Sequence, residues 1–412
     1  MPTTATTDAV IDTAVGNGFD LKSIVRPNIW NLEAYRCARD DFSEGILLDA
    51  NENSYGPVTG IVAGDHGLQP ATDPQTNPLQ LHRYPDPLGR SVKQRLLKLR
   101  QGIRSPDQIF LGVGSDEVID LLVRILCVPG QDEILITPPT YGMYKVVAAV
   151  NDVGVVRVPL DVEDGRFQLQ VDKMLEAIAL HPNTKLVWLC SPGNPTATRL
   201  ETRDIERILN SGYRGVVVVD EAYIDFASYE EDLSLAPLVN KYPNLVVMQT
   251  LSKGFGLAGI RLGVAFADPR LVEILNKTKA PYNVSSLTLK VAEGSLDDKS
   301  IANMRRTIAH LIKLRDEYLV PELLKLPRVG GIVGTSSANF VLARIVDKDG
   351  NPDNELAHHI YNDMASNHSI VVRYRGNELG CEGCLRITVG TEYENQCLIA
   401  KLRELLSKAV DK

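Results

Sequence analysis

The sequence predicts an α/β fold built on a mostly parallel sheet of seven strands, and two features support this. Short apolar runs alternate with helical patterns from about residue 90 to residue 280. The runs are rich in Val, Ile and Leu, which is typical of strands buried on both faces. Strands that alternate with helices form a sheet with helices on both sides. The predicted strands span 108–113, 133–137, 154–159, 185–190, 215–220, 244–250 and 261–267.

A different pattern begins near residue 285 and predicts a second, smaller α+β domain. A long helical pattern covers 301–326, and a second helix is expected over 392–409. Three strand-like runs lie between them, at 338–345, 369–374 and 384–389. We therefore divide the chain into a disordered tail (1–18), an N-terminal arm (19–60), a cofactor-binding large domain (61–284) and a small C-terminal domain (285–412).

Composition and charge exclude several classes of partner. The 44 Lys and Arg residues face 52 Asp and Glu residues, and no basic run is present, so nucleic acid is not an expected partner. No apolar stretch is long enough to cross a membrane, and the first residues resemble neither a secretory signal nor a mitochondrial address. Several of the six cysteines lie in apolar runs, which is typical of buried thiols. These features predict a reduced, cytoplasmic protein.

Lys253 is the strongest candidate for chemistry. It follows the predicted strand 244–250 and lies between hydroxyl residues and glycines, whereas most lysines are solvated surface residues. A lysine amine can form a Schiff base with an aldehyde cofactor when its surroundings lower its pKa. Thr250 and Ser252 offer hydroxyl groups beside it, and Arg261 offers a guanidinium fork that suits a phosphate.

The glycines of the same segment match a second motif, which we reject. Gly254, Gly256 and Gly259 have the G-x-G-x-x-G spacing of dinucleotide-binding loops. That motif requires a helix to begin in the glycine loop, but an apolar run starts only three residues after Gly259. We expect the glycines instead to let the backbone turn tightly beside a bulky ligand.

Asp220 ends the predicted strand 215–220, and Tyr223 follows three residues later. An acid at this end of a buried strand lies where α/β sheets bind ligands, and a buried carboxylate needs a cationic partner. The ring nitrogen of pyridoxal phosphate is such a partner, and Asp220 would keep it protonated so that the ring takes up electrons. Tyr223 could donate a hydrogen bond to the ring hydroxyl. The alternative is that Asp220 only caps the following helix.

Three more strand ends carry candidate ligands. Asn194 follows the strand 185–190 in a Pro- and Gly-rich loop, which could be only a turn, and could donate its amide to the ring oxygen. Gly114, Ser115 and Asp116 open a helix, and free backbone amides there suit a phosphate. Tyr141 follows the strand 133–137 and could stack on the ring. Together these elements form one site at the carboxyl edge of the sheet.

With these residues in place, the sequence resembles the fold-type I pyridoxal-phosphate-dependent aminotransferases and, within them, the histidinol-phosphate aminotransferases. The resemblance runs from about Leu21 to the end of the chain. Segments near Lys279 and Arg386 separate this family from other aminotransferases better than the lysine motif does. The matching stretches are 48–53, 83–87, 114–117, 139–144, 220–223, 250–253, 279–282 and 385–391.

The resemblance implies a role for each candidate. Lys253 would hold the cofactor covalently and move the proton at the substrate Cα, with the ring held by Asp220, Asn194 and Tyr223. Tyr141 would stack on the ring. The cofactor phosphate would be bound by Gly114, Ser115, Asp116, Ser252 and Arg261, and by Tyr84 of a neighbouring subunit, which implies a homodimer. Arg373, Arg386, Asn194 and Tyr35 would bind the substrate.

The implied reaction is a two-step transamination. Glutamate donates its amino group to the cofactor and leaves as 2-oxoglutarate, and the aminated cofactor converts imidazole acetol phosphate into histidinol phosphate. One pocket must accept a carboxylate and then a phosphate, and arginine forks suit both anions. For Arg373 and Arg386 the alternative is plain surface charge on a strand.

One position departs from the family pattern, and other functions remain open. Ala197 replaces the glycine that usually follows Asn-Pro-Thr, and we expect its Cβ to limit a positive φ there. The alternatives are an aminotransferase for another amino acid, a related phospho-amino-acid decarboxylase, and a non-catalytic binding protein with this fold. A single C-x-x-C pair at Cys381 and Cys384 and the adjacent His358 and His359 do not predict a metal site.

Overall fold

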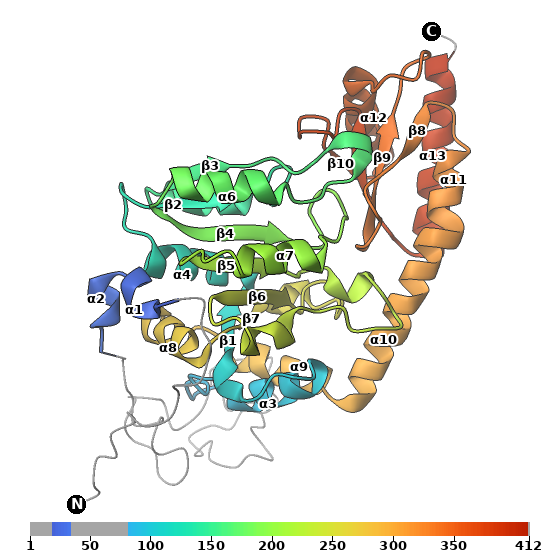
Figure 1. Ribbon diagram of the computed structural model, residues 1–412. Coiled ribbons are helices and arrows are strands. Elements are labelled where there is room, and N and C mark those ends of the chain that lie inside the picture. The colour runs from blue at the N-terminus through green and yellow to red at the C-terminus, as the bar shows by residue number, and fades with distance from the viewer. Residues whose placement is uncertain (1–18, 34–80, 411–412) are drawn as a thin grey trace, which may run out of the picture.

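One mixed sheet organises the larger part of the chain. The structure is a computed structural model that describes residues 19–33 and 81–410. Seven strands form the sheet in the order β1-β7-β6-β5-β4-β2-β3 (Figure 1). They are β1 (Ile109–Val113), β2 (Glu133–Ile136), β3 (Gly154–Arg157), β4 (Thr184–Cys190), β5 (Val216–Asp220), β6 (Leu245–Thr250) and β7 (Leu262–Phe266). All seven predicted strands are present. Strand β7 runs antiparallel to both of its neighbours, so the predicted mostly parallel sheet is confirmed.

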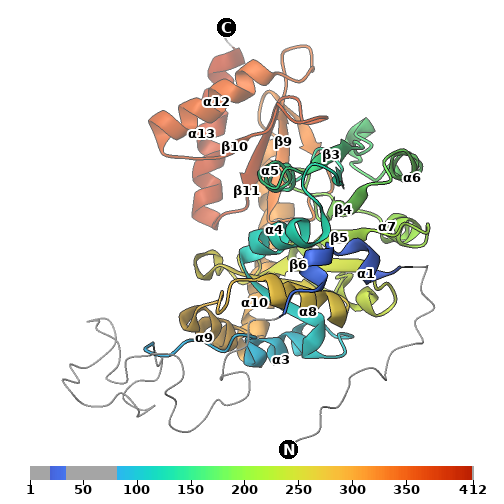
Figure 2. The same cartoon turned by 90° about the vertical axis from the view of Figure 1, so that its left-hand side faces the viewer.

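Helices cover both faces of this sheet. Residues alternate along the strands, so that Val217 and Val219 of β5 face one hydrophobic core while Val216 and Val218 face the other. Full burial of each such side chain contributes about 1.5–3 kcal/mol. The first face is covered by α3 (Arg90–Leu99), α6 (Val171–Leu180), α7 (Thr202–Leu209), α9 (Ser286–Ser295) and α10 (Asp298–Lys313). The second is covered by α1 (Leu21–Ile24), α4 (Gly114–Leu126), α5 (Met143–Val150) and α8 (Pro269–Thr278), all of which are labelled in Figure 2.

The C-terminal part forms a second, antiparallel sheet in the order β10-β11-β9-β8. Its strands are β8 (Val329–Val333), β9 (Phe340–Ile345), β10 (Arg373–Tyr374) and β11 (Cys384–Thr388). They pack with α11 (Val320–Leu324), α12 (Asn354–His368) and α13 (Glu392–Val410). The predicted strand 369–374 is wrong over most of its length, because Ser369 ends α12 in a left-handed conformation. Strand β8 was not predicted, since Gly330 and Gly331 interrupt its apolar pattern.

A continuous helical segment joins the two sheets. Helix α10 leads through a π-helical stretch, Leu314–Leu319, into α11. The long helix predicted over 301–326 is therefore present, and it begins slightly earlier, at Asp298. Side chains of α9 and α10, such as Leu289 and Ile308, belong to the core beside the large sheet, whereas Leu323 of α11 belongs to the small-domain core. The domain boundary predicted near residue 285 stays a prediction. In the structure, the side chains pass from the core beside the large sheet to the small-domain core within the long helix.

Shorter elements complete the described chain. Helix α2 (Pro27–Trp30) follows α1, and the backbone N–H of Arg26 between them donates to the carbonyl of Ile125 at 3.0 Å. Residues 19–33 therefore dock on α4, and the rest of the predicted arm lies outside the described residues. Short 3-10 helices occur at Pro106–Gln108, Glu163–Gly165, Ile224–Phe226, Ala236–Asn240 and Ala258–Ile260. No helix among the described residues has the length and apolar character needed to span a bilayer.

Candidate active site

A cavity of about 510 Å³ lies where β4, β5 and β6 end. Its volume is in the range of small-molecule sites. Parallel strands bring their carboxyl ends to one edge, and antiparallel β7 begins at that same edge. Twelve of the predicted residues line the cavity together: Ser115, Asp116, Tyr141, Asn194, Asp220, Tyr223, Thr250, Ser252, Lys253, Arg261, Arg373 and Arg386. The structure thus brings together residues from the ends of five strands and from the small domain.

Lys253 projects into this cavity from the loop after β6. Its Nζ lies 5.7 Å from the centre of the Tyr223 ring. Partial burial lowers the pKa of Lys253, and the nearby charges of Arg386 and Arg261 lower it further. A lower pKa increases the fraction of neutral amine, which is the form that reacts with an aldehyde or accepts a proton.

Asp220 is the buried acid of the site, with 3% of its surface exposed. Burial raises its pKa to about 6, although hydrogen bonds from Tyr144 and from the Ala222 backbone N–H oppose the rise. Within the described residues it forms no ion pair at 4.0 Å or less. The helix-capping alternative fails, because the next element is a short 3-10 helix whose N-cap is Tyr223. A buried carboxylate without a cation fits a site for a positively charged ring nitrogen.

Tyr144 contacts Asp220 and was not among the predicted site residues. Its hydroxyl donates a 2.7 Å hydrogen bond to Oδ2 of Asp220, and its ring stacks on Trp188 with centroids 4.8 Å apart. The side chain is fully buried in α5 against the sheet. Buried tyrosine hydroxyls usually find a partner. A tyrosine on an apolar helix face therefore indicates a buried hydroxyl with a hydrogen-bond partner. The sequence alone does not show that this partner is Asp220.

The start of α4 and the start of β7 form a tight cradle for an anion. Gly114 has a φ of 71°, and a Cβ there would overlap the guanidinium of Arg261. A Cβ on Gly263 would overlap the backbone of Gly114 and Ser115. Arg261 also pairs with Asp116 at 3.3 Å. Two glycines and one arginine thus bring the amino end of a helix against a cationic fork, an arrangement that suits phosphate.

The loop from Gly254 to Gly259 has no helix of the dinucleotide-binding type. It contains only the 3-10 helix Ala258–Ile260, and β7 starts immediately after Arg261. The rejection of the dinucleotide motif is confirmed. Thr250 and Ser252 at the start of this loop hydrogen-bond to each other through their hydroxyls at 2.9 Å.

The loop that carries Asn194 corrects one expectation. Ala197 has a φ of 52° and is fully buried, so its Cβ does not prevent a left-handed conformation. That conformation costs a residue other than glycine about 1–2 kcal/mol. Backbone hydrogen bonds at 2.8 Å from Ala197 N–H to Gly193 and from Gly193 N–H to Thr198 hold the turn. Asn194 is itself 8% exposed and remains directed toward the cavity.

The small domain contributes arginines to the same cavity. Arg373 of β10 and Arg386 of β11 lie opposite each other in the antiparallel register. Nη1 of Arg386 donates to Oδ1 of Asn194 at 2.6 Å, which leaves the Asn194 amide N–H groups as donors for a ligand. Arg375 lines the cavity as well and was not predicted. Its place in the cavity depends on the pairing of the short strand β10 with β11, which is a tertiary contact.

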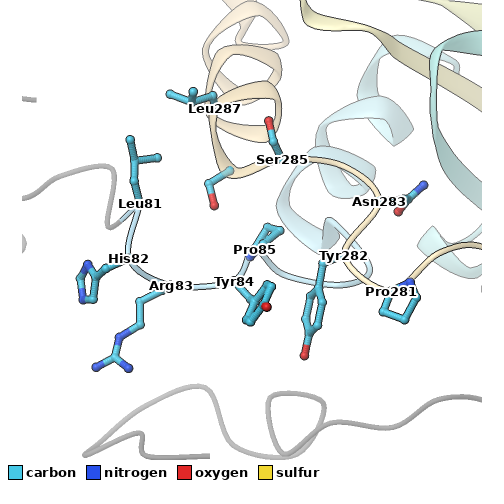
Figure 3. A pocket seen from close by; sticks show the side chains of 11 residues that line it. Leu81, His82, Arg83, Tyr84, Pro85, Pro281, Tyr282, Asn283, Ser285 and Leu287 are labelled. Atoms are coloured by element: carbon cyan, nitrogen blue, oxygen red, sulfur yellow. The ribbon is translucent and has the colours of Figure 1, made fainter. Parts of the chain in front are cut away.

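Tyr84 lies in a different cavity, of about 520 Å³, beside the segment before α9. Its ring stacks on Tyr282 with centroids 4.5 Å apart, and 52% of its surface is exposed (Figure 3). Within one chain it does not reach the cavity that holds Lys253, so its predicted role in a neighbouring subunit stays a prediction. Tyr35 lies outside the described residues.

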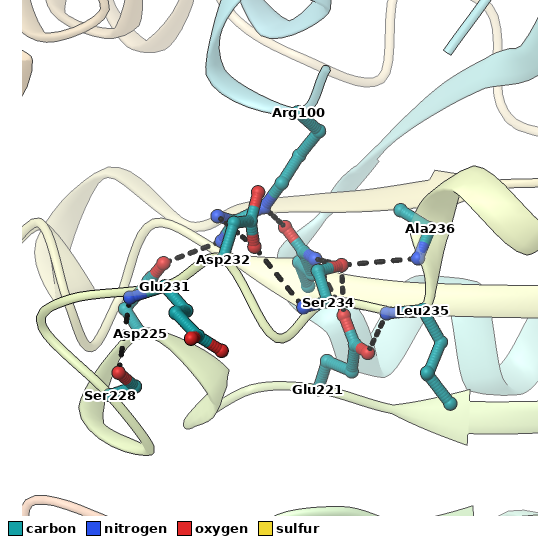
Figure 4. A network of polar contacts seen from close by, with 10 residues as sticks. Arg100, Glu221, Asp225, Ser228, Glu231, Asp232, Ser234, Leu235 and Ala236 are labelled. Atoms are coloured by element: carbon teal, nitrogen blue, oxygen red, sulfur yellow. Dashed lines mark hydrogen bonds and ion pairs between the residues drawn. The ribbon is translucent and has the colours of Figure 1, made fainter. Parts of the chain in front are cut away.

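A buried polar network around Arg100 and Glu221 lies next to the strand ends that carry the site (Figure 4). Arg100, at the end of α3, pairs with Asp225 at 2.5 Å and donates to Gln249 at 2.9 Å. Gln249 in turn donates to Glu221 at 2.7 Å. Glu221 and Gln249 directly adjoin Asp220 and Thr250, and a Cβ on Gly254 would overlap Asp225. This network therefore supports the strand ends that carry the site.

Cys384 begins β11 and Cys381 lies just before it, and both residues are fully buried. Burial raises the pKa of Cys384 to about 11, so the thiol stays protonated near neutral pH. No group of three His, Cys, Asp or Glu side chains that could hold a metal ion occurs within 19–33 and 81–410.

Comparison with known proteins gives one consistent family. Residues 43–402 match the model of the family described as aminotransferase class I and II. The chain is 48% identical to the histidinol-phosphate aminotransferase of Saccharomyces cerevisiae, over 95% of this chain and 98% of that protein. It is 47% identical to the Candida maltosa protein of the same name, over 94% and 99%. The fold is also similar to that of the Sinorhizobium meliloti histidinol-phosphate aminotransferase in complex with pyridoxal-5'-phosphate, with a TM-score of 0.69, 23% identity and coverage of 87% and 90%.

Proposed function

This chain belongs to the class I and II aminotransferases, and within them to the histidinol-phosphate aminotransferase family, and we propose that it catalyses that family's reaction. It would transfer the amino group of histidinol phosphate to 2-oxoglutarate, giving imidazole acetol phosphate and glutamate. Under biosynthetic conditions the reaction would run in the opposite direction and supply histidine biosynthesis. The observation that carries the proposal is the convergence of Lys253, Asp220 and the small-domain arginines on one cavity.

The residues of the cavity fit pyridoxal phosphate, the cofactor of this family. The glycine cradle at Gly114 and Gly263 and the guanidinium of Arg261 would hold its phosphate. Asp220 would supply the negative charge that a protonated ring nitrogen requires. When bound, pyridoxal phosphate supplies an aldehyde that condenses with amines and a ring that takes up electrons.

The protein groups have distinct tasks in such a reaction. Lys253, whose pKa is lowered, would accept the proton from the substrate Cα and return it during the second half of the cycle. Asp220 would keep the ring nitrogen protonated, and Tyr144 would keep Asp220 ionised by donating to its carboxylate. Asn194 and Tyr223 would hold the ring oxygen, and Tyr141 would lie against the ring.

The substrate has an anionic end that suits the small-domain arginines. Arg373 and Arg386 would bind the phosphate of one substrate and a carboxylate of the other, since guanidinium forks match both groups. Tyr35 would close over the bound substrate. The arginines come from the small domain and Lys253 from the large one, so binding would bridge the two.

We also propose a homodimer in the cytoplasm. Tyr84 and Tyr282 form a partly exposed aromatic pair away from the cavity of their own chain. In a dimer, Tyr84 would reach the cofactor phosphate of the other subunit. Light scattering of the purified protein would test the dimer, and a monomer at working concentration would exclude it.

An exchange assay tests the proposed activity. The purified holoenzyme is incubated with histidinol phosphate and 2-oxoglutarate, and glutamate formation is measured beside the absorbance spectrum of the bound cofactor. Glutamate formation with this pair supports the proposal. Exchange with a different amino donor alone, or release of CO₂ from a phosphorylated amino acid, would favour the alternative enzymes. A bound cofactor without any turnover would indicate a non-catalytic protein.

A further inference from the structure

Three arginines of the small domain enter the cavity close together. Arg373 and Arg386 are cross-strand partners in β10 and β11. The backbone N–H of Arg375 donates to the carbonyl of Cys384 at 2.9 Å, which continues this pairing by one step. Arg375 is two residues from Arg373 and therefore lies on the same side of the strand. All three side chains line the cavity that contains Lys253.

The positive charge of this group is not balanced within the described part of the chain. None of the three arginines forms an ion pair with an acid in 19–33 or 81–410. Like charges at directly opposite strand positions are destabilising. Burial lowers the pKa of Arg375, and the charge of Arg373 lowers it further. Glu378, whose N–H donates to the Arg375 carbonyl at 2.9 Å, opposes this effect less strongly.

Arg375 differs from Arg386 in how its donors are used. Arg386 donates to Asn194, and its guanidinium lies 5.2 Å from the centre of the Phe340 ring. The Nε of Arg375 is buried and has no hydrogen-bond partner among the described residues. A buried donor without a partner is unfavourable, so no acceptor of the described residues fixes this guanidinium through its Nε. Arg375 lines the cavity, and its guanidinium is therefore available to a ligand there.

We propose that Arg375 determines specificity by making the anion subsite prefer a doubly charged phosphate over a carboxylate. A phosphate monoester carries a charge of about −1.5 to −2 at pH 7 and three acceptor oxygens, whereas a carboxylate carries one charge and two oxygens. Arg373 and Arg386 suffice for a carboxylate. The third guanidinium matches the additional charge and oxygen. This inference rests on the proposed function in one respect, namely that a phosphate-bearing substrate uses this cavity.

The test measures anion binding to the holoenzyme, separately from turnover. Inorganic phosphate and acetate are titrated against wild type, Arg375→Gln and Arg375→Lys, with competition against the amino donor as the readout. Arg403→Gln is the matched control, because it removes an exposed arginine of the same domain. We expect Arg375→Gln to weaken phosphate binding at least about tenfold, the size of one charge-assisted hydrogen bond, and to change acetate binding less than about threefold. Arg375→Lys should retain part of the preference, and the control should retain all of it.

Kinetics of the two half-reactions provide the second readout. Arg375→Gln should raise KM for histidinol phosphate more than KM for glutamate, with a smaller change in kcat. An equal loss for both anions and both substrates, or no loss for either, would overturn the inference. The proposed function fails differently. A wild-type enzyme that prefers phosphate to acetate but does not use histidinol phosphate would disprove that substrate and leave the role of Arg375 intact.

Discussion

The hydroxyl of Tyr144 donates a 2.7 Å hydrogen bond to the carboxylate of Asp220, and both groups are buried beneath the cavity. Tyr144 belongs to α5 and Asp220 ends β5, so the bond ties a covering helix to the strand that carries the buried acid. Burial alone would favour protonated Asp220, whereas the bond favours the carboxylate. Tyr144 therefore maintains the charge that the proposed ring contact requires.

The first prediction concerns this bond. Tyr144→Phe removes the donor and leaves a buried carboxylate with one hydrogen bond fewer, so unfolding should require about 1–3 kcal/mol less free energy. The pKa of Asp220 should rise, and pyridoxal phosphate should dissociate more readily from the variant. Urea unfolding and absorbance titration with the cofactor measure the two effects. Tyr229→Phe is the control, because Tyr229 is 61% exposed and its substitution should change stability by less than about 0.5 kcal/mol. Equal cofactor affinity in Tyr144→Phe and wild type would disprove the link.

The second prediction concerns the close approach of β7 to α4. In Gly263→Ala the new methyl group overlaps the backbone of Gly114, so the cradle must open. Overpacking of this kind costs about 1–3 kcal/mol, and cofactor affinity should fall together with stability. Gly259→Ala in the same segment is the control, since a Cβ there meets no atom within 4 Å. Similar cofactor affinity in the two variants would show that the cradle does not depend on this contact.

The third prediction concerns the pH dependence of stability and Glu221, which belongs to the buried network around Arg100. Burial raises the pKa of Glu221 from 4.5 to about 7. Between these values the folded protein binds a proton that the unfolded chain has released, so stability falls as pH rises through this window. The shift corresponds to a contribution on the order of 3 kcal/mol that is present below about pH 4.5 and lost above about pH 7.

Glu221→Gln should reduce this pH dependence. Unfolding free energies at several pH values between 4 and 8 would be compared for the variant and wild type. Asp220, whose pKa is also raised, should leave a residual slope of the same sign in both proteins. The variant loses hydrogen bonds and should be less stable, but only the difference in slope tests the prediction. Parallel curves would show that Glu221 does not titrate in this range.

The fourth prediction concerns Lys253. Lys253→Ala should lose the absorbance of covalently bound cofactor and at least about 10²–10⁴-fold in turnover, the usual contribution of a positioned acid–base group. Cofactor binding itself should persist, because the Gly114 cradle and Asp220 are unchanged. Ser295→Ala, in α9, is the control, because it removes a polar side chain that hydrogen-bonds to the backbone of its own helix. Full activity in Lys253→Ala would contradict a covalent mechanism.

Local features of the fold and site were predictable from the sequence. The seven strands of the large sheet follow from their apolar runs, and the loop after β6 was correctly separated from a dinucleotide motif because a strand follows Gly259 so closely. The weaker predictions lie where local patterns are short or interrupted. Glycines hid β8, and Ser369 ended a helix where a strand was expected. Ala197 adopts a conformation that its side chain disfavours, because the surrounding loop hydrogen bonds outweigh the cost.

By itself, the sequence determined which side chains stand at strand ends, because periodicity and turn residues are properties of neighbours along the chain. That was enough to identify Lys253 and Asp220. Only the tertiary structure decided which distant residues meet these groups. Tyr144 lies 76 residues from Asp220 along the chain, and Arg100 lies 149 residues from Gln249. Such contacts depend on the order of the strands in the sheet and on how each helix packs across it. Patterns of neighbouring residues along the chain do not show either of these.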